Sequence, residues 1–108
     1  MSEKLNKSSR YINLIKTGIN EAKKGEYSKS RRIFEDCIKL DKLNFRAYIN
    51  LSNIFVLEKN YNEAIELLKK HIVLKKYNIE ILSHICKIYS KYYSNNHVIK
   101  YLKFLEQK

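Results

Sequence analysis

The side chains best suited to nucleophilic, redox or metal chemistry are two cysteines and three histidines, and their spacing favours none of these roles. Cys37 and Cys86 are far apart, so the Cys-x-x-Cys spacing typical of zinc and redox sites is missing. His71, His84 and His97 are too widely separated for two of them to share a metal on one helical turn. We therefore expect no metal, no cofactor and no catalytic residues.

Carboxylates are the remaining candidates for acid–base chemistry, and they lie in polar stripes beside lysines. Glu66 and Lys70, for example, are four residues apart, which is the spacing of a supporting ion pair on one face of a helix. The chain has only two glycines and no proline, which excludes a glycine-rich phosphate loop. These features predict that the protein is not an enzyme.

The charge balance is the feature that most directly suggests a binding partner. The chain has 22 Lys and Arg residues against 11 Asp and Glu residues, for a formal net charge of +11. Such an excess favours acidic or anionic partners. A second explanation stays open, because the abundant residue types (Lys, Ile, Asn and Tyr) share codons rich in adenine and thymine, so a biased genome could supply the charge.

The elements that must position these residues are helices. Apolar residues recur at offsets of three, four and seven, as in Ile81, Leu82, Ile85 and Ile88. Short polar breaks between such stretches predict six helices, over 11–24, 27–40, 45–58, 61–74, 79–92 and 97–107. Residues 1–10 are rich in Ser, Lys and Asn and are expected to form a flexible leader.

The polar breaks recur about every 34 residues, an interval that we call the repeat length. Residues one repeat length apart match in size. Small residues occupy one position in the first helix of each pair: Gly18, Ser52 and Cys86. Large apolar residues occupy one position in the second helix: Phe34, Leu68 and Leu102. A small residue lets two crossing helices approach, and a large one opposite fills the space. The pattern predicts three helix pairs, over residues 11–44, 45–78 and 79–108.

This pattern resembles the tetratricopeptide repeat family, whose helix–turn–helix unit is about 34 residues long. Tyr27 and Tyr61 are one such unit apart. Residues 45–78 fit best, with Tyr48, Leu51-Ser52, Phe55, Tyr61, Ala64 and Leu68 in the family's slots. The other two repeats depart from the family pattern in several slots. The resemblance implies an all-α solenoid of six antiparallel helices stacked in a right-handed superhelix, with one domain over residues 11–108. A plain antiparallel helical bundle is the alternative fold.

The resemblance also implies surroundings for the cysteines and for one histidine. Cys37 and Cys86 fall in slots where the family has small residues, so both are expected to be buried core thiols. His71 falls on the inward stripe of a second helix and is expected to be buried or partly buried. These residues are therefore predicted to pack rather than to react.

In the family, the first helices of successive pairs line a concave groove. Carried over to this chain, the groove includes eight candidate ligand-binding residues: Lys16, Lys23, Arg46, Asn50, Asn53, His84, Lys87 and Lys91. Glu80 and Ser83 are further polar residues of the same surface. Amide side chains can bond a peptide backbone, and lysines can meet carboxylates. The resemblance therefore implies a scaffold or adaptor that binds an acidic peptide segment or a partner subunit in this groove.

The last predicted helix is unusually apolar for the end of a repeat array, which normally has a polar cap. Tyr101 and Phe104 are the candidates for an exposed patch that docks on another copy of the chain or on a larger assembly. In the alternative, these two rings simply fold over the last helix.

Nucleic acid is the second class of partner. Basic clusters lie near Tyr27, Tyr61 and Tyr77, so lysines could neutralise phosphates and tyrosines could stack on unpaired bases of an RNA. The charge is spread evenly over the repeats, which favours the peptide groove. Two cysteines and the lack of a long apolar run are typical of the cytoplasm or another reducing compartment inside the cell, without a transmembrane segment.

Overall fold

Six helices and the short turns between them account for the part of the chain that the structure describes. The computed structural model describes residues 3–76 and 78–107, and no strand occurs within these ranges. The helices are α1 (Glu3–Lys23), α2 (Tyr27–Leu40), α3 (Phe45–Leu57), α4 (Tyr61–Leu74), α5 (Ile79–Tyr92) and α6 (Asn95–Glu106). Each helix packs against the next one, and α3 also contacts α1 and α5. The expected all-α repeat array is confirmed.

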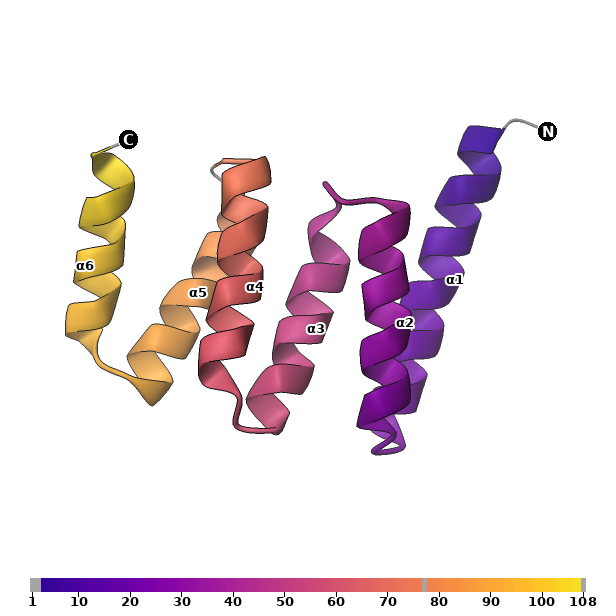
Figure 1. The fold of residues 1–108 in the computed structure, drawn as a ribbon, viewed down its shortest axis with the longest axis horizontal. Coiled ribbons are helices and arrows are strands. Elements are labelled where there is room, and N and C mark those ends of the chain that lie inside the picture. The colour runs from indigo at the N-terminus through magenta and orange to yellow at the C-terminus, as the bar shows by residue number, and fades with distance from the viewer. Residues whose placement is uncertain (1–2, 77, 108) are drawn as a thin grey trace.

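The helix pairs follow one another along the longest axis of the molecule, from α1 at one end to α6 at the other (Figure 1). In this view α2 lies in front of α1, and α4 lies in front of α5. The helices α1 and α2 contact each other, and so do α4 and α5. The second helices therefore cover one side of the array. The first helices, α1, α3 and α5, contact one another in sequence on the other side.

The N-terminus differs from the prediction. The first helix begins at Glu3 and not at residue 11, so residues 3–10, which were expected to precede the first helix, belong to it; residues 1 and 2 lie outside the described range. From residue 6 onward, the first buried side chain is Tyr11, whose hydroxyl accepts a hydrogen bond of 3.1 Å from the backbone N–H of Ala47. A helix anchored there can extend backwards without an apolar face, because adding residues to a formed helix needs no new nucleus.

The predicted pairing of a small and a large residue is confirmed in the first helix pair. A Cβ atom on Gly18 would lie only 2.5 Å from Cε1 of Phe34, so α1 and α2 cross at the closest approach their side chains allow. The hydroxyl of Ser30 donates a 2.8 Å hydrogen bond to the carbonyl oxygen of Gly18 at the same crossing. In the second pair, Ser52 and Leu68 are both fully buried.

In the third helix pair, α5 and α6, the prediction of a large residue that fills the space between the helices is wrong. Leu102 is 37% exposed, whereas its counterparts in the first two pairs are buried. The turns explain part of the difference. Gly25 and Lys59, at equivalent positions of the first two repeats, both adopt left-handed backbone conformations, with φ of 81° and 64°. Their counterpart Tyr93 has φ of −122°, and a bulky residue disfavours the left-handed region.

The Tyr93 side chain contacts residues of α4, α5 and α6. Its hydroxyl donates a hydrogen bond to Oδ1 of Asn62 at the start of α4. Its ring lies 5.3 Å from the ring of His97 and 5.6 Å from that of Tyr89. Figure 1 shows α6 at the end of the array. Helix α6 also begins at Asn95 rather than at the predicted residue 97.

Candidate functional site

The predicted groove residues lie on the three first helices, and we call this surface the α1–α3–α5 face. Its members are Lys16 and Lys23 on α1, Arg46, Asn50 and Asn53 on α3, and His84, Lys87 and Lys91 on α5. Asn50 and His84 are half-buried, and the other six side chains are exposed. None of the eight is buried in the core, so every one of them can meet a ligand.

One contact brings predicted residues of two repeats together. Nε2 of His84 lies 3.3 Å from Oδ1 of Asn53, so the ring nitrogen donates and the amide oxygen accepts. Partial burial lowers the pKa of His84, and the positive charge of Lys87 lowers it further. The imidazole is therefore neutral at neutral pH, with its proton on Nε2. This contact joins α3 to α5 across the repeat boundary.

The remaining groove residues are not brought into contact with one another. Nδ2 of Asn50 donates a 2.9 Å hydrogen bond to the carbonyl oxygen of Arg46 in its own helix, so one of its donors is already used. The ammonium of Lys91 lies 5.3 Å from the centre of the Tyr92 ring. Within the described residues, no ion pair involves any of the five cations of the face, Lys16, Lys23, Arg46, Lys87 and Lys91. Their charges are thus available to an anionic partner.

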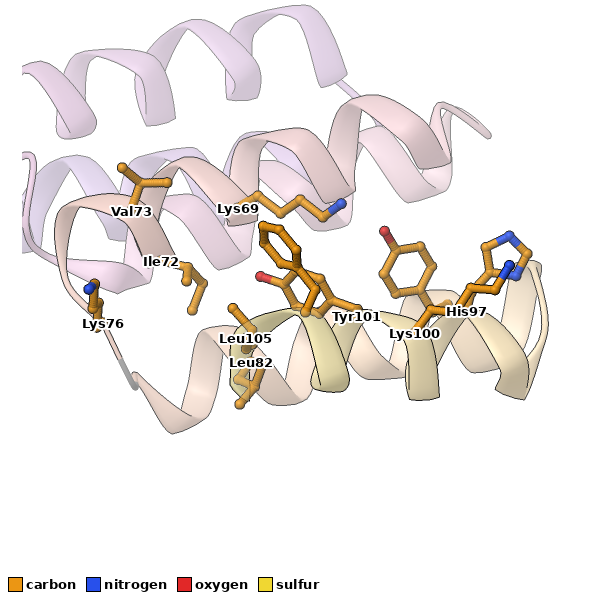
Figure 2. Close-up of a pocket in the computed structure, with 11 residues that line it drawn as sticks. Lys69, Ile72, Val73, Lys76, Leu82, His97, Lys100, Tyr101 and Leu105 are labelled. Atoms are coloured by element: carbon orange, nitrogen blue, oxygen red, sulfur yellow. The ribbon is translucent and has the colours of Figure 1, made fainter. Parts of the chain in front are cut away.

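A cavity of about 660 Å³ at the C-terminal end of the array was not predicted from the sequence. We call it the C-terminal cavity. Figure 2 shows Lys69, Ile72 and Val73 reaching it from α4, and His97, Lys100 and Tyr101 from α6. Leu82 and Tyr89 of α5 form its floor, and Lys76, Phe104 and Leu105 complete the lining.

The two interface candidates both line this cavity, but they differ in exposure. Tyr101 is only 8% exposed, and its ring lies 6.0 Å from that of Tyr89 and 6.4 Å from that of Phe104. Burial raises the pKa of Tyr101 to about 12. Phe104 is 51% exposed. Tyr101 therefore packs inward and is not part of an exposed patch, whereas Phe104 keeps half of its surface accessible.

The cysteines and His71 occupy packing positions. Cys37 is fully buried, and burial raises the pKa of its thiol to about 11. Cys86 is only half-buried, which corrects the expectation of a buried thiol; its pKa is raised by the same cause. His71 is fully buried as expected, with Nε2 2.9 Å from the carbonyl oxygen of Leu43. Its ring meets that of Tyr48 edge-on at 4.9 Å.

The described residues contain neither a metal-binding cluster nor a helix that could span a membrane. No group of three or more His, Cys, Asp or Glu side chains there is placed to hold a metal ion. In the same part of the chain, none of the helices combines the length and the hydropathy needed to cross a membrane.

Comparison with known proteins gives no family. No protein-family model matches the chain, and no curated protein matches it. The likeness to tetratricopeptide repeats therefore rests on the residue pattern and on the array of helices.

Proposed function

We propose that the protein is a non-catalytic interaction module that binds a peptide segment of a partner protein on the α1–α3–α5 face. The contact between Asn53 and His84 is the observation that carries this proposal. It places hydrogen-bonding side chains of successive repeats next to each other on an accessible surface. A ligand that runs along the array would meet them in turn, as an extended or helical peptide does in a groove.

The charges around that contact favour an acidic segment. Arg46 and Lys87 are exposed on the same two helices, α3 and α5, and Lys91 follows one turn after Lys87. Guanidinium and ammonium groups form charge-assisted hydrogen bonds with carboxylates, which are stronger than neutral ones. Neutral His84 and Asn53 can at the same time bond the peptide backbone.

An RNA partner has weaker support. Base stacking needs an accessible aromatic face. The ring of Tyr61 is stacked on Tyr92 at 4.1 Å, and Tyr27 is half-buried against the core. Tyr77 lies outside the described residues. The lysines could still attract phosphates without sequence preference, so RNA belongs in the test as a competing ligand.

The test is a selection of peptides from a random display library on the intact protein, followed by affinity measurements at physiological salt. The Arg46→Glu/Lys87→Glu variant should bind the selected peptides at least about tenfold more weakly, because two attractive charges become repulsive. The Arg32→Glu/Lys39→Glu variant is the matched control, with the same change in net charge at exposed positions on α2. Equal loss in both variants, or tighter binding of a mixed-sequence RNA, would contradict the proposal.

A further inference from the structure

The C-terminal cavity has a counterpart one repeat earlier, which we call the α2–α4 groove. That groove lies between α2 and α4 over α3, as the cavity lies between α4 and α6 over α5. The apolar lining corresponds at an offset of one repeat length: Ile38, Phe55 and Leu67 correspond to Ile72, Tyr89 and Tyr101. The two hollows are therefore the same surface of the repeat, and differences between them can be compared position by position.

The charged lining residues differ between the two hollows. The acidic residues of the α2–α4 groove become basic or imidazole side chains: Glu35, Glu63 and Glu66 correspond to Lys69, His97 and Lys100. Lys76 adds a third lysine, and no Asp or Glu among the residues that the structure describes lines the C-terminal cavity. Among the described residues no ion pair involves these lysines. The cavity is thus a basic site, whereas the earlier groove carries both signs of charge.

Lys69 is held in place over the aromatic floor. Its ammonium lies 5.5 Å from the centre of the Tyr89 ring and 5.0 Å from that of the Tyr101 ring. Cation–π attraction at this distance orients the charge without neutralising it. A carboxylate that enters the cavity would therefore meet a cation that is already positioned.

The residues at the rim also differ between the two hollows: they are charged in the α2–α4 groove and apolar in the C-terminal cavity. Lys39 and Lys70 of the α2–α4 groove correspond to Val73 and Phe104, which are 78% and 51% exposed. These two residues come from α4 and α6 and therefore flank the cavity on both sides. Exposed apolar side chains on both rims favour an occupant with its own apolar face.

We infer that the C-terminal cavity is a second binding surface, which takes an acidic amphipathic helix from a partner protein. Leucine-type side chains of such a helix would fill the apolar floor and cover Val73 and Phe104. Its flanking carboxylates would meet Lys69, Lys76 and Lys100. The cavity volume of about 660 Å³ can hold several inserted side chains. This inference goes beyond the proposed function, because it concerns different residues on a different surface of the array.

Two other occupants fit less well. A second copy of the chain carries a net charge of +11, so it would bring like charges against the lysines of the cavity. A small anionic amphiphile such as a fatty acid would satisfy one lysine and fill the floor. It would leave the exposed rim residues Val73 and Phe104 in water, however, whereas a helix covers both.

The experiment uses the full chain and a fluorescein-labelled peptide of about 18 residues, roughly five helical turns. The peptide carries leucines on one face and glutamates beside them. A second peptide has lysine in place of every glutamate, and a third has the composition of the first in scrambled order. Fluorescence anisotropy should show that the acidic amphipathic peptide binds at least about tenfold more tightly than either of the others.

Variants that transplant the earlier groove into the cavity locate the binding site. Lys69→Glu/Lys100→Glu introduces the residues found at the corresponding positions, and it should weaken binding by about tenfold or more. Val73→Gln/Phe104→Gln removes the apolar rim without adding charge and should weaken binding by about fivefold or more. It changes only exposed positions, so it tests the site even where the first variant loses stability. Arg32→Glu/Lys39→Glu, at exposed positions on α2, is the control with the same charge change as the first variant and should leave binding within about twofold. Arg46→Glu/Lys87→Glu is measured alongside, because it reports binding on the α1–α3–α5 face.

Each other outcome overturns the inference. Binding lost in Arg46→Glu/Lys87→Glu but kept in both cavity variants would place the acidic peptide on the α1–α3–α5 face, which supports the proposed function while removing the second surface. Equal binding of the scrambled peptide would show attraction to charge alone. Complete displacement of the peptide by dodecanoate at stoichiometric amounts, with no loss in Val73→Gln/Phe104→Gln, would assign the cavity to a small amphiphile.

Discussion

Gly18 and Phe34 meet so closely at the crossing of α1 and α2 that no side chain fits between them. A single carbon added to Gly18 would approach the phenylalanine ring to within 2.5 Å. The ring itself is 1% exposed and belongs to the main core, so it has little room to move. The tight fit of the first helix pair therefore depends on having no side chain at residue 18.

We predict that Gly18→Ala destabilises the protein by about 1–3 kcal/mol, since the added methyl group must push apart a packed crossing. Chemical denaturation followed by circular dichroism measures the change. Phe34→Leu, which makes room on the other side, should recover part of the loss in the double variant. Simple addition of the two single effects would show that the two residues do not act through this contact.

Two equivalent turn positions should respond with opposite signs. Gly25 and Lys59 both have left-handed backbone conformations, but only glycine adopts them without a steric penalty. Gly25→Ala should lower the free energy of unfolding by about 1 kcal/mol. Lys59→Gly should raise it by less than about 1 kcal/mol. Thermal unfolding of the two variants, with Lys75→Gly as a control at a position of extended backbone, checks both signs.

Acid should weaken the protein through His84. The pKa of His84 is about 6.5 in the unfolded chain and lower in the folded protein. Below pH 6.5 the unfolded chain therefore binds more protons at this ring than the folded protein does. Stability contributed by the neutral ring is present above pH 6.5 and declines as pH falls through the folded pKa. Titration of the ring by NMR measures the shift directly.

Lys87→Ala should raise the pKa of His84 toward its ordinary value, because one nearby positive charge is removed; the larger part of the shift, from burial, should remain. An unchanged titration curve in this variant would show that Lys87 has no electrostatic effect on the ring.

The two thiols should differ in reactivity. Cys37 is fully buried with a pKa of about 11, whereas Cys86 is half-buried. Because the thiolate is the reactive form, iodoacetamide at pH 8 should modify Cys86 faster than Cys37 in the folded protein. The rates should become equal in denaturant. Cys37→Ser and Cys86→Ser identify which thiol is modified, and faster modification of Cys37 would contradict its burial.

Much of the helix arrangement could be predicted from the sequence, because apolar spacing and polar breaks report directly on which faces are buried. The predicted ranges 27–40, 61–74 and 79–92 coincide with α2, α4 and α5. The early start of α1 could not be predicted in this way, since an exposed helical extension needs no apolar stripe. Arg46, Asn53, Lys87 and Lys91 are exposed on α3 and α5, which follows from the same helical phase.

The C-terminal cavity could not be foreseen, because it is lined by side chains of three helices whose packing distances the residue pattern does not fix. Tyr93 occupies the position of Gly25 and Lys59, and its ring and hydroxyl contact residues of α4, α5 and α6. A comparison of charges between equivalent positions of successive repeats was the available signal. It would have shown Glu35 and Glu66 replaced by Lys69 and Lys100 on the same face of the second helices.

Asn44 and Asn78 cap the N-termini of α3 and α5, and this position in the repeat bears on how the chain can gain or lose repeats. Asn44 Oδ1 accepts a hydrogen bond from the backbone N–H of Arg46, and Asn78 Oδ1 accepts one from that of Ile81. Each asparagine is the last residue of one repeat unit and caps the helix that opens the next unit. A further copy of residues 45–78 spliced in after Asn78 would find its starting cap already in place and would bring its own for the unit behind it. Growth or shortening by whole units therefore preserves every junction.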